Sequence, residues 1–163
     1  MRQQCDNQQW ETVISSPASR CLNFASDWSR QRQCVLHIEA AWQEIDFGAW
    51  DGLTAEEIEQ RHPGSLRDFY ANPDSYTPPS GEPYAQFANR VRQAWEGVLN
   101  TFPGQRILVV THGGVIRALY AQLLSTPPRH SLQIDVPHAC LTRFSCFQEA
   151  DNRFVQLNFH KPA

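Results

Sequence analysis

The chain lacks the cysteine and histidine patterns of a disulfide framework or a metal centre. Its 163 residues contain five cysteines, an odd number, and no Cys-x-x-Cys pair. We therefore expect buried or free thiols in a reducing cytoplasm and no disulfide framework. No pair of histidines has metal-ligand spacing with carboxylate or cysteine support, so we expect neither a metal nor another cofactor.

The chain also lacks long apolar runs and a strong excess of charge. A net charge of −3 offers no field for nucleic acid or an anionic membrane. No apolar run approaches membrane-spanning length, and the first ten residues lack the apolar centre of a signal peptide. With 41% hydrophobic and 19% charged residues, we expect one globular cytoplasmic domain; if its substrate is an anion, a local pocket must attract it. The composition leaves the oligomeric state open.

What the chain does have is an alternation of short apolar strands and amphipathic helices. The predicted strands are residues 10–15, 34–38, 107–110, 132–136, 139–147 and 153–159, and the predicted helices are residues 17–31, 55–62, 83–100 and 115–123. Thr54 and Glu57 form a capping box at the start of the second helix, and residues 71–83 are too rich in turn residues for regular structure. The last two strands are expected to form a hairpin at the sheet edge. This order predicts a three-layer α/β domain.

The stretch "RILVVTHGGVIRALY", residues 106–120, is the strongest candidate for a functional site. Its apolar run suits a strand buried in a parallel sheet, and His112 lies where that strand passes into a helix. This is the carboxyl edge of the sheet, where ligands bind as a rule. Gly113 and Gly114 let backbone N–H groups approach a bound anion at the amino end of the helix. A helix-capping role for His112 is the alternative.

Two further segments carry candidate groups, each with a structural alternative. In "SSPASR", residues 15–20, Arg20 lies one turn into a helix and can grip a phosphate with its guanidinium, or it can be one more solvated arginine. In the aromatic loop 42–52, burial would raise the pKa of Glu44 and keep a proton available, or Glu44 can be a plain loop carboxylate. Asp46 and Asp51 are expected to be turn or cap residues.

The loop 77–83, "TPPSGEP", has two interpretations. It can cover the site as a lid, or Gly81 and Glu82 can serve as ordinary helix-start residues, which we favour. His138 could reach the site, but its spacing does not require this. We expect His37 to lie in the core and His130 and His160 at the surface.

Taken in order, "SSPASR", "EIDFGAWDG", "SGEP" and "VVTHGGVIR" resemble the successive motifs of the histidine phosphatase superfamily, over about residues 12–124. The chain resembles its α-ribazole phosphatase branch, which acts in cobalamin assembly. The resemblance implies an αβα sandwich with a mainly parallel sheet and a phosphohistidine mechanism that needs no metal. It implies that Arg20 binds phosphoryl oxygens, that Glu44 protonates the leaving oxygen, and that His112 and the N–H of Gly113 stabilise the phosphoryl group.

The chain departs from the family pattern at the nucleophile. No Arg-His-Gly occurs in its 163 residues. The resemblance implies that the first strand and that motif precede residue 1, so we expect an amino-terminally incomplete domain over 1–163, with residues 2–9 as the tail of the first helix. The missing strand would lie beside the strand that ends at His112. A phosphomonoester hydrolase is the preferred interpretation; a catalytically inactive phosphoester-binding module and an incomplete fragment are the alternatives.

Overall fold

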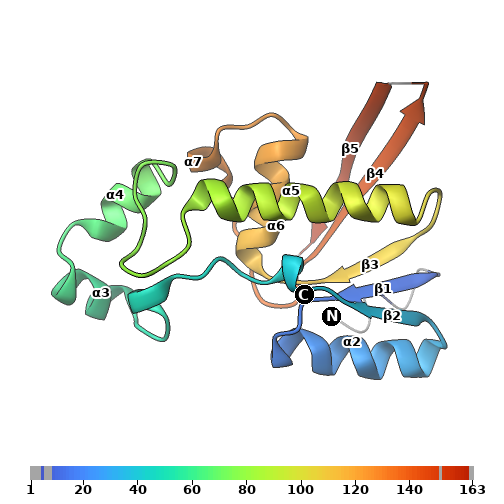
Figure 1. Cartoon of the computed structure of the whole chain (residues 1–163), viewed down its shortest axis with the longest axis horizontal. Helices are drawn as coiled ribbons and strands as arrows, with labels where there is room; N and C mark the ends of the chain where they lie inside the picture. Colours follow the sequence, from blue (N-terminus) through green and yellow to red (C-terminus); the bar gives the residue numbers. More distant parts are fainter. Residues whose placement is uncertain (1–4, 6–8, 151, 162–163) are drawn as a thin grey trace.

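A parallel three-stranded sheet forms the centre of the computed structural model, which describes residues 5, 9–150 and 152–161. Its strands are β1 (Thr12–Ser15), β2 (Val35–Ile38) and β3 (Ile107–Val110), in the order β2-β1-β3 (Figure 1). Val35 and Ile107 both pair with Thr12, so the three strands end at one common edge. β1 is buried along its whole length because it has a strand on each side and a helical layer on each face.

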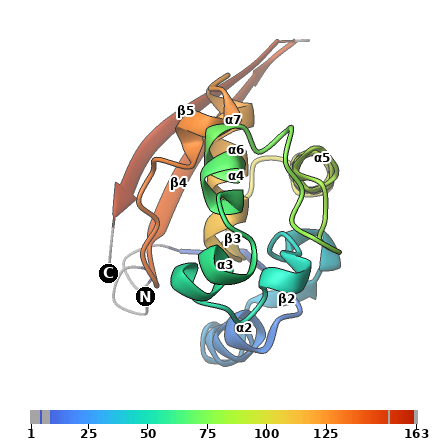
Figure 2. The same cartoon turned by 90° about the vertical axis from the view of Figure 1, so that its left-hand side faces the viewer.

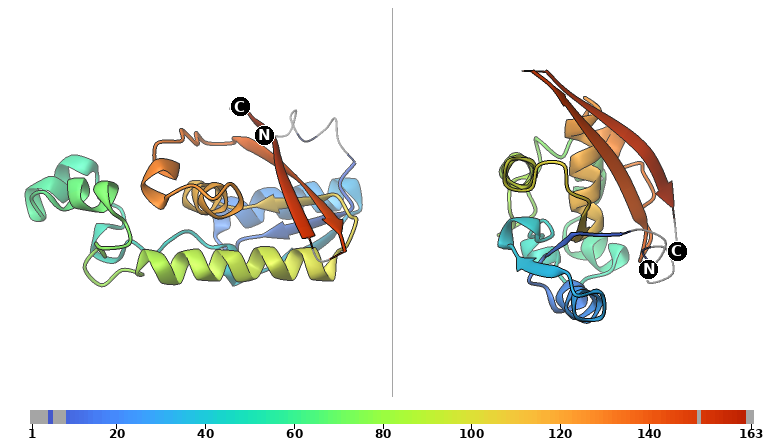
Figure 3. Two further views of the ribbon diagram at one scale, coloured as in Figure 1. Left: turned by 90° about the horizontal axis from the view of Figure 1, so that it is seen from above. Right: turned by 90° about the vertical axis from the view of Figure 1, so that its right-hand side faces the viewer.

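Helices cover both faces of this sheet, which confirms the predicted three-layer architecture. α2 (Ser19–Arg32) lies on one face, and α5 (Tyr84–Thr101) and α6 (Gly113–Leu123) lie on the other (Figures 1 and 3). Alternate residues of β1 point to the two layers: Val13 packs with Trp28 of α2, whereas Ile14 packs with Phe87 of α5 and Val115 of α6. The apolar stripe of each helix therefore meets one face of the sheet.

A small helical lobe stands beyond the carboxyl ends of the strands (Figures 1 and 2). It contains the short helices η2 (Gly48–Trp50), α3 (Ala55–Arg61) and α4 (Ser65–Ala71), whereas η1 (Ala40–Trp42) lies beside the sheet and its Trp42 packs in the main core (Figure 1). The capping box of Thr54 and Glu57 is confirmed at the start of α3. α4 is absent from the predicted helices because it has only seven residues and starts immediately after the turn at Gly64. Residues 72–83 contain no helix or strand, as predicted.

The prediction of a strand over residues 132–136 is wrong. α7 (Pro128–Ser131) precedes an irregular loop there. The carbonyl of Ile134 accepts a hydrogen bond from Arg117 Nε at 2.9 Å, and the carbonyl of Asp135 lies 2.7 Å from His160 Nε2. Side chains from other elements therefore satisfy backbone groups that a strand would use for pairing.

The predicted hairpin is confirmed, but its place at the edge of the central sheet is wrong. β4 (Leu141–Glu149) and β5 (Asn152–Lys161) pair antiparallel as a separate two-stranded sheet. Figure 3 shows this hairpin leaning across the α6 side of the molecule. Phe144 of β4 packs edge-on against Trp95 and Tyr120, so aromatic packing attaches it to the helical layer.

The edge of β3 that faces away from β1 has no strand partner among residues 5, 9–150 and 152–161. The family resemblance places a further strand at this position. The helix tail predicted for residues 2–9 lies outside the described residues, apart from Cys5 and Gln9; Cys5 is helical and fully buried beside Val13 and Leu108. In the described part of the chain, no helix has both the length and the apolar character needed to cross a bilayer.

Candidate functional site

His112 lies at the carboxyl end of β3, immediately before α6, and only 6% of its surface is exposed. Its Nδ1 is 2.8 Å from Arg20 Nη2, and its Nε2 is 2.8 Å from Ser16 Oγ. A guanidinium only donates hydrogen bonds, so Nδ1 accepts and the proton of the neutral ring is on Nε2, which donates to Ser16. The parallel sheet thus brings together Arg20 and His112, which are separated by 92 residues.

The surroundings of His112 keep its ring neutral. Burial, together with the charges of Arg20 and Arg90, lowers the pKa of His112 from the ordinary value of 6.5 to about 4. The side chain makes no capping hydrogen bond to α6, so the capping alternative is not supported. A neutral imidazole clamped beside a guanidinium is a preformed site for an anion that can bring or accept a proton.

This environment predicts that acid destabilises the fold through His112. The unfolded chain takes up a proton on this ring near pH 6.5, whereas the folded chain does so only near pH 4. Between these values the unfolded state binds more protons, so the free energy of unfolding falls as the pH falls through this window. We expect this dependence to weaken in His112→Gln, as measured by thermal unfolding across the window. An unchanged pH profile in the variant would contradict the assignment.

Glu44 follows η1 and reaches the amino end of α6. Its Oε2 accepts a hydrogen bond from the backbone N–H of Gly114 at 3.0 Å, and its Oε1 accepts one from the N–H of Ile45 at 3.1 Å. Burial raises the pKa of Glu44 above its ordinary value, although these two hydrogen bonds and the charges of Arg20 and Arg117 oppose the rise. Glu44 is therefore a half-buried carboxyl fixed at a helix terminus, which contradicts the plain-loop alternative.

Gly114 is the position where a single methyl group should move this carboxyl. A Cβ there would lie 2.2 Å from Glu44 Oε1, which is the flexible end of a side chain and can move away. Alanine favours a helix over glycine, but by less in the first turn than the roughly 1 kcal/mol of a helix interior. The displaced carboxyl also loses its hydrogen bond from the Gly114 N–H, so Gly114→Ala should unfold at a slightly lower temperature. We expect the pKa of the displaced Glu44 to fall toward its ordinary value, as measured by carboxyl ¹³C NMR. Gly97→Ala in α5 is the control, because a Cβ there would meet nothing within 4 Å, and in this variant the pKa of Glu44 should not change.

Arg117 is a residue of the site that the sequence analysis missed. Gly113 opens α6, and a Cβ on it would lie 3.2 Å from Arg117 Nη1, so this guanidinium covers the first turn of the helix. Arg117 lies four residues after Gly113, a spacing that places two residues on one helix face, so the sequence contained this signal. The charges of Arg117 and Arg20 both lower the pKa of Glu44.

The loop 77–83 is packed as structure and does not form a separate lid. The N–H of Ala49 donates to the carbonyl of Pro79 at 2.9 Å, and the N–H of Glu82 donates to the carbonyl of Asp46 at 2.8 Å. Pro78 is fully buried. These contacts tie this loop to the segment that carries Glu44. They do not match the favoured interpretation of ordinary helix-start residues, because α5 begins at Tyr84 with Pro83 as its cap, while the Glu82 side chain pairs with Arg90.

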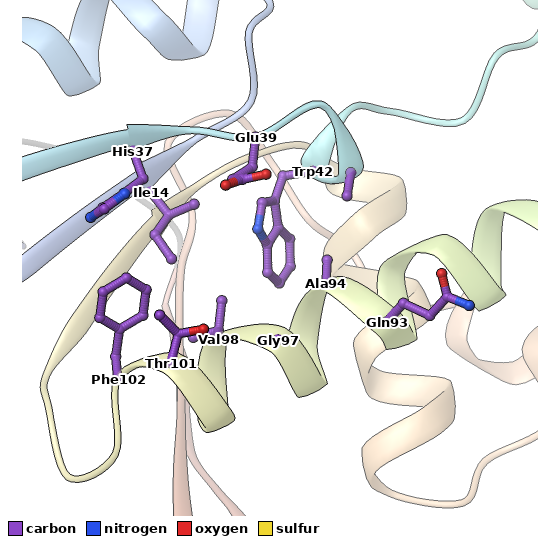
Figure 4. Close-up of a pocket in the computed structure, with 11 residues that line it drawn as sticks. Ile14, His37, Glu39, Trp42, Gln93, Ala94, Gly97, Val98, Thr101 and Phe102 are labelled. Atoms are coloured by element: carbon purple, nitrogen blue, oxygen red, sulfur yellow. The ribbon is translucent and has the colours of Figure 1, made fainter.

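A hollow of about 380 Å³ lies between β2 and α5 (Figure 4). His37, Trp42 and Phe102 contribute rings to its lining, and His37 packs against Phe102 at 5.1 Å between ring centres. Arg20, Glu44 and His112 do not line it. Trp42 connects it indirectly to the polar site, because its carbonyl accepts a hydrogen bond from Thr111 Oγ1 at 2.7 Å, next to His112.

The remaining histidines have other neighbours. His130 lies 3.2 Å from Arg129 Nε, and the ring of His160 packs edge-on against Tyr120 and lies 2.8 Å from Thr142 Oγ1. The surface position predicted for His160 is therefore only partly correct, because this residue of β5 is half-buried. His138 lies in the irregular loop before β4.

Similar proteins include phosphatases from bacteria and plants. Phosphoserine phosphatase 1 of Hydrogenobacter thermophilus is 28% identical over 124 residues, which are 76% of this chain and 59% of that protein. The metal-independent phosphoserine phosphatase of Arabidopsis thaliana is 33% identical over 113 residues, 68% of this chain and 48% of that protein. Across the relatives from Mycobacterium, Hydrogenobacter and Arabidopsis, the chain spans 29% to 59% of their length.

The fold is shared with solved structures of lower identity. A mycobacterial glucosyl-3-phosphoglycerate phosphatase superimposes with a TM-score of 0.84 at 22% identity, over 96% of this chain and 79% of that chain. The α-ribazole phosphatase of Shigella flexneri has a TM-score of 0.78 at 24% identity, over 94% of this chain and 74% of that chain. A profile of the histidine phosphatase superfamily, branch 1, matches residues 1–160, and on this evidence the chain belongs to that superfamily.

Proposed function

We propose that this protein is a phosphomonoester hydrolase of the phosphohistidine type that acts on a small phosphorylated metabolite in the cytoplasm. The observation that supports this most is the meeting of Arg20, His112 and Glu44 at the amino end of α6. A cation, an imidazole and a protonated carboxyl are the groups that phosphoryl transfer needs for binding and for release of the leaving oxygen.

Arg20 and His112 would hold the phosphoryl group. The exposed guanidinium has further N–H donors beyond the one that contacts His112, and these fit two phosphoryl oxygens. The Nε2–H of His112 would turn from Ser16 to a third oxygen, and the N–H of Gly113 would add a donor at the positive end of α6. An arriving dianion would also raise the pKa of His112.

Glu44 would act as the general acid. Burial favours the protonated form of this carboxyl, and in the transfer step a proton on Glu44 would pass to the leaving oxygen as the ester P–O bond breaks. The resulting carboxylate could then take a proton from the water that attacks the phosphohistidine. The two N–H groups that bind Glu44 would stabilise this carboxylate between the two steps.

The presence or absence of a nucleophilic histidine distinguishes the two candidate functions, a hydrolase and a phosphoester-binding module. In the family scheme a histidine of an Arg-His-Gly motif forms a bond to phosphorus, and the 163 residues contain no such motif. His112 is the histidine that contacts Arg20, and its role there is as a donor to oxygen. The second candidate is therefore a module that binds a phosphoester without cleaving it.

For the substrate we propose a small phosphomonoester, with α-ribazole 5′-phosphate as the first compound to test. The resemblance of the sequence motifs to the α-ribazole phosphatase branch suggests this compound, and the structural likeness to the Shigella flexneri enzyme supports the shared fold. Phosphoserine and glucosyl-3-phosphoglycerate, named in other relatives, belong in the same panel.

Two measurements test the proposal. Calorimetry with orthovanadate tests binding, which should occur in the wild-type chain. Hydrolysis of p-nitrophenyl phosphate and α-ribazole 5′-phosphate tests turnover; for the 163-residue chain we expect no rate above that of His112→Ala. An Arg-His-Gly motif encoded in frame upstream of Met1 would support the hydrolase, and adding it should restore turnover. Vanadate binding without turnover in that longer chain would support the binding module, and no vanadate binding at all would reject both.

A further inference from the structure

Arg90 of α5 connects three parts of the molecule that meet behind Glu44. Its Nη1 donates to the carbonyls of Ala41 and Gln43 at 3.0 and 2.9 Å, and its Nη2 lies 3.4 Å from the carbonyl of Glu44 itself. One guanidinium therefore satisfies most of the backbone acceptors in the segment that leads from η1 into Glu44. η1 ends at Trp42, and no helix or strand holds Gln43 and Glu44, so their conformation depends on such contacts.

Glu82 fixes the other side of the same guanidinium. Its two oxygens accept from Arg90 Nη2 at 2.7 Å and from Nε at 3.2 Å, which is a bidentate pair. The side chains are sheltered, with 26% of Arg90 and 18% of Glu82 exposed. The N–H of Glu82 also donates to the carbonyl of Asp46, two residues after Glu44. The two residues thus hold the Glu44 segment from before and after the carboxyl.

Arg90 contacts Glu44 through the backbone of its segment. Arg20 and Arg117 lower the pKa of Glu44 by their charge. Arg90, bound to the Glu82 carboxylate, lowers the pKa of His112 by its charge and contacts the Glu44 segment through hydrogen bonds to its carbonyls. Arg90 therefore acts on Glu44 through geometry. A lysine could not replace it, because one ammonium cannot donate in the fork that reaches a carboxylate and several carbonyls together.

We propose that Arg90 and Glu82 are a positioning pair that holds the Glu44 carboxyl against the amino end of α6. This inference rests on the proposed role of Glu44 as the general acid. If the pair is lost, the segment 41–44 gains freedom, the carboxyl meets water, and its hydrogen bond to Gly114 is made only part of the time.

The test compares Arg90→Gln, Arg90→Lys and Glu82→Gln with the wild-type chain. Carboxyl ¹³C NMR should show the pKa of Glu44 falling toward its ordinary value in all three. Hydrogen exchange at the Gly114 amide should become faster by about tenfold, the effect of losing one hydrogen bond to a charged group. Arg92→Gln is the matched control, because Arg92 is exposed on the same helix and its Nη2 donates to Asn89 Oδ1 at 2.7 Å, one turn away on that helix. It should change neither quantity.

Vanadate binding separates this inference from the proposed function. Wild-type binding that survives in Arg90→Gln, with a lowered Glu44 pKa, supports the positioning role. An unchanged Glu44 pKa and Gly114 exchange rate in folded variants would overturn it, even if vanadate binds. Failure of the wild type to bind vanadate would reject the proposed function and leave the positioning pair to be judged by the Glu44 pKa alone. If Arg90→Gln unfolds, Glu82→Gln and Arg90→Lys decide.

Discussion

Arg20→Ala is expected to weaken the binding of orthovanadate by about a hundredfold, or about 2.7 kcal/mol. The guanidinium contacts the His112 ring at 2.8 Å and holds Nδ1 of that ring as an acceptor. Its removal would take away a charged donor for the anion and would free the ring to rotate or change tautomer. Titration calorimetry measures the loss directly.

Two variants make this expectation specific. Arg20→Lys keeps the charge without the fork and should bind vanadate with intermediate affinity. Arg30→Ala removes a charge from the same helix, where the side chain is 77% exposed and lies 3.4 Å from Asp27, and it should leave the affinity unchanged. Equal affinities for wild type and Arg20→Ala would remove Arg20 from the site and with it the main support for a phosphate-binding function.

Gly48→Ala should cost about 3–5 kcal/mol of folding free energy, which lowers the unfolding temperature of a domain this size by about 6–20 °C. Gly48 has a φ of +55°, which disfavours any side chain, and a Cβ would lie 2.4 Å from the carbonyl oxygen of Pro79 and 2.5 Å from the N of Gly81. These are backbone atoms that cannot turn away. The loop 77–83 would have to separate from the segment 46–49.

Other glycines of the chain separate the cost of a positive φ from the cost of a close contact with backbone atoms. Gly52 and Gly104 have φ values of +78° and +75° but open space where a Cβ would lie, so alanine there should cost only the conformational strain of about 1–2 kcal/mol. Gly81→Ala has the opposite character, with an ordinary φ and a contact of 2.8 Å to the carbonyl of Asp46. If Gly48→Ala unfolds no earlier than Gly52→Ala, the close packing of the two loops is not important for stability.

These two loops show why the site depends on residues far from it. Glu44 lies between Arg90 on one side and the contact of Glu82 with Asp46 on the other. The motif "SGEP" therefore contributes by packing: Gly81 permits the close approach and Glu82 holds the arginine. We expect substitutions that disturb this packing to change the pKa of Glu44 more than they change the contact between Arg20 and His112.

Local sequence patterns were sufficient for most of the elements. The capping box at Thr54, the apolar stripe of α5 and the short run before His112 all depend on interactions between residues close in the chain. The same patterns failed for residues 132–136. This alternating apolar and polar sequence forms an irregular loop, in which Arg117 and His160 hydrogen-bond to backbone carbonyls. Periodicity cannot detect a partner that arrives from another element.

By itself the sequence determined the alternation of strands and helices, the position of His112 at a strand end, and the motifs that resemble a phosphatase family. Only the tertiary structure decided that Arg20 contacts His112, that Glu44 binds the N–H of Gly114, and that Arg90 holds the backbone behind it. The physical reason is distance along the chain. Helix and strand preferences act over a few residues, whereas these contacts exist because a parallel sheet brings the ends of distant strands to one edge.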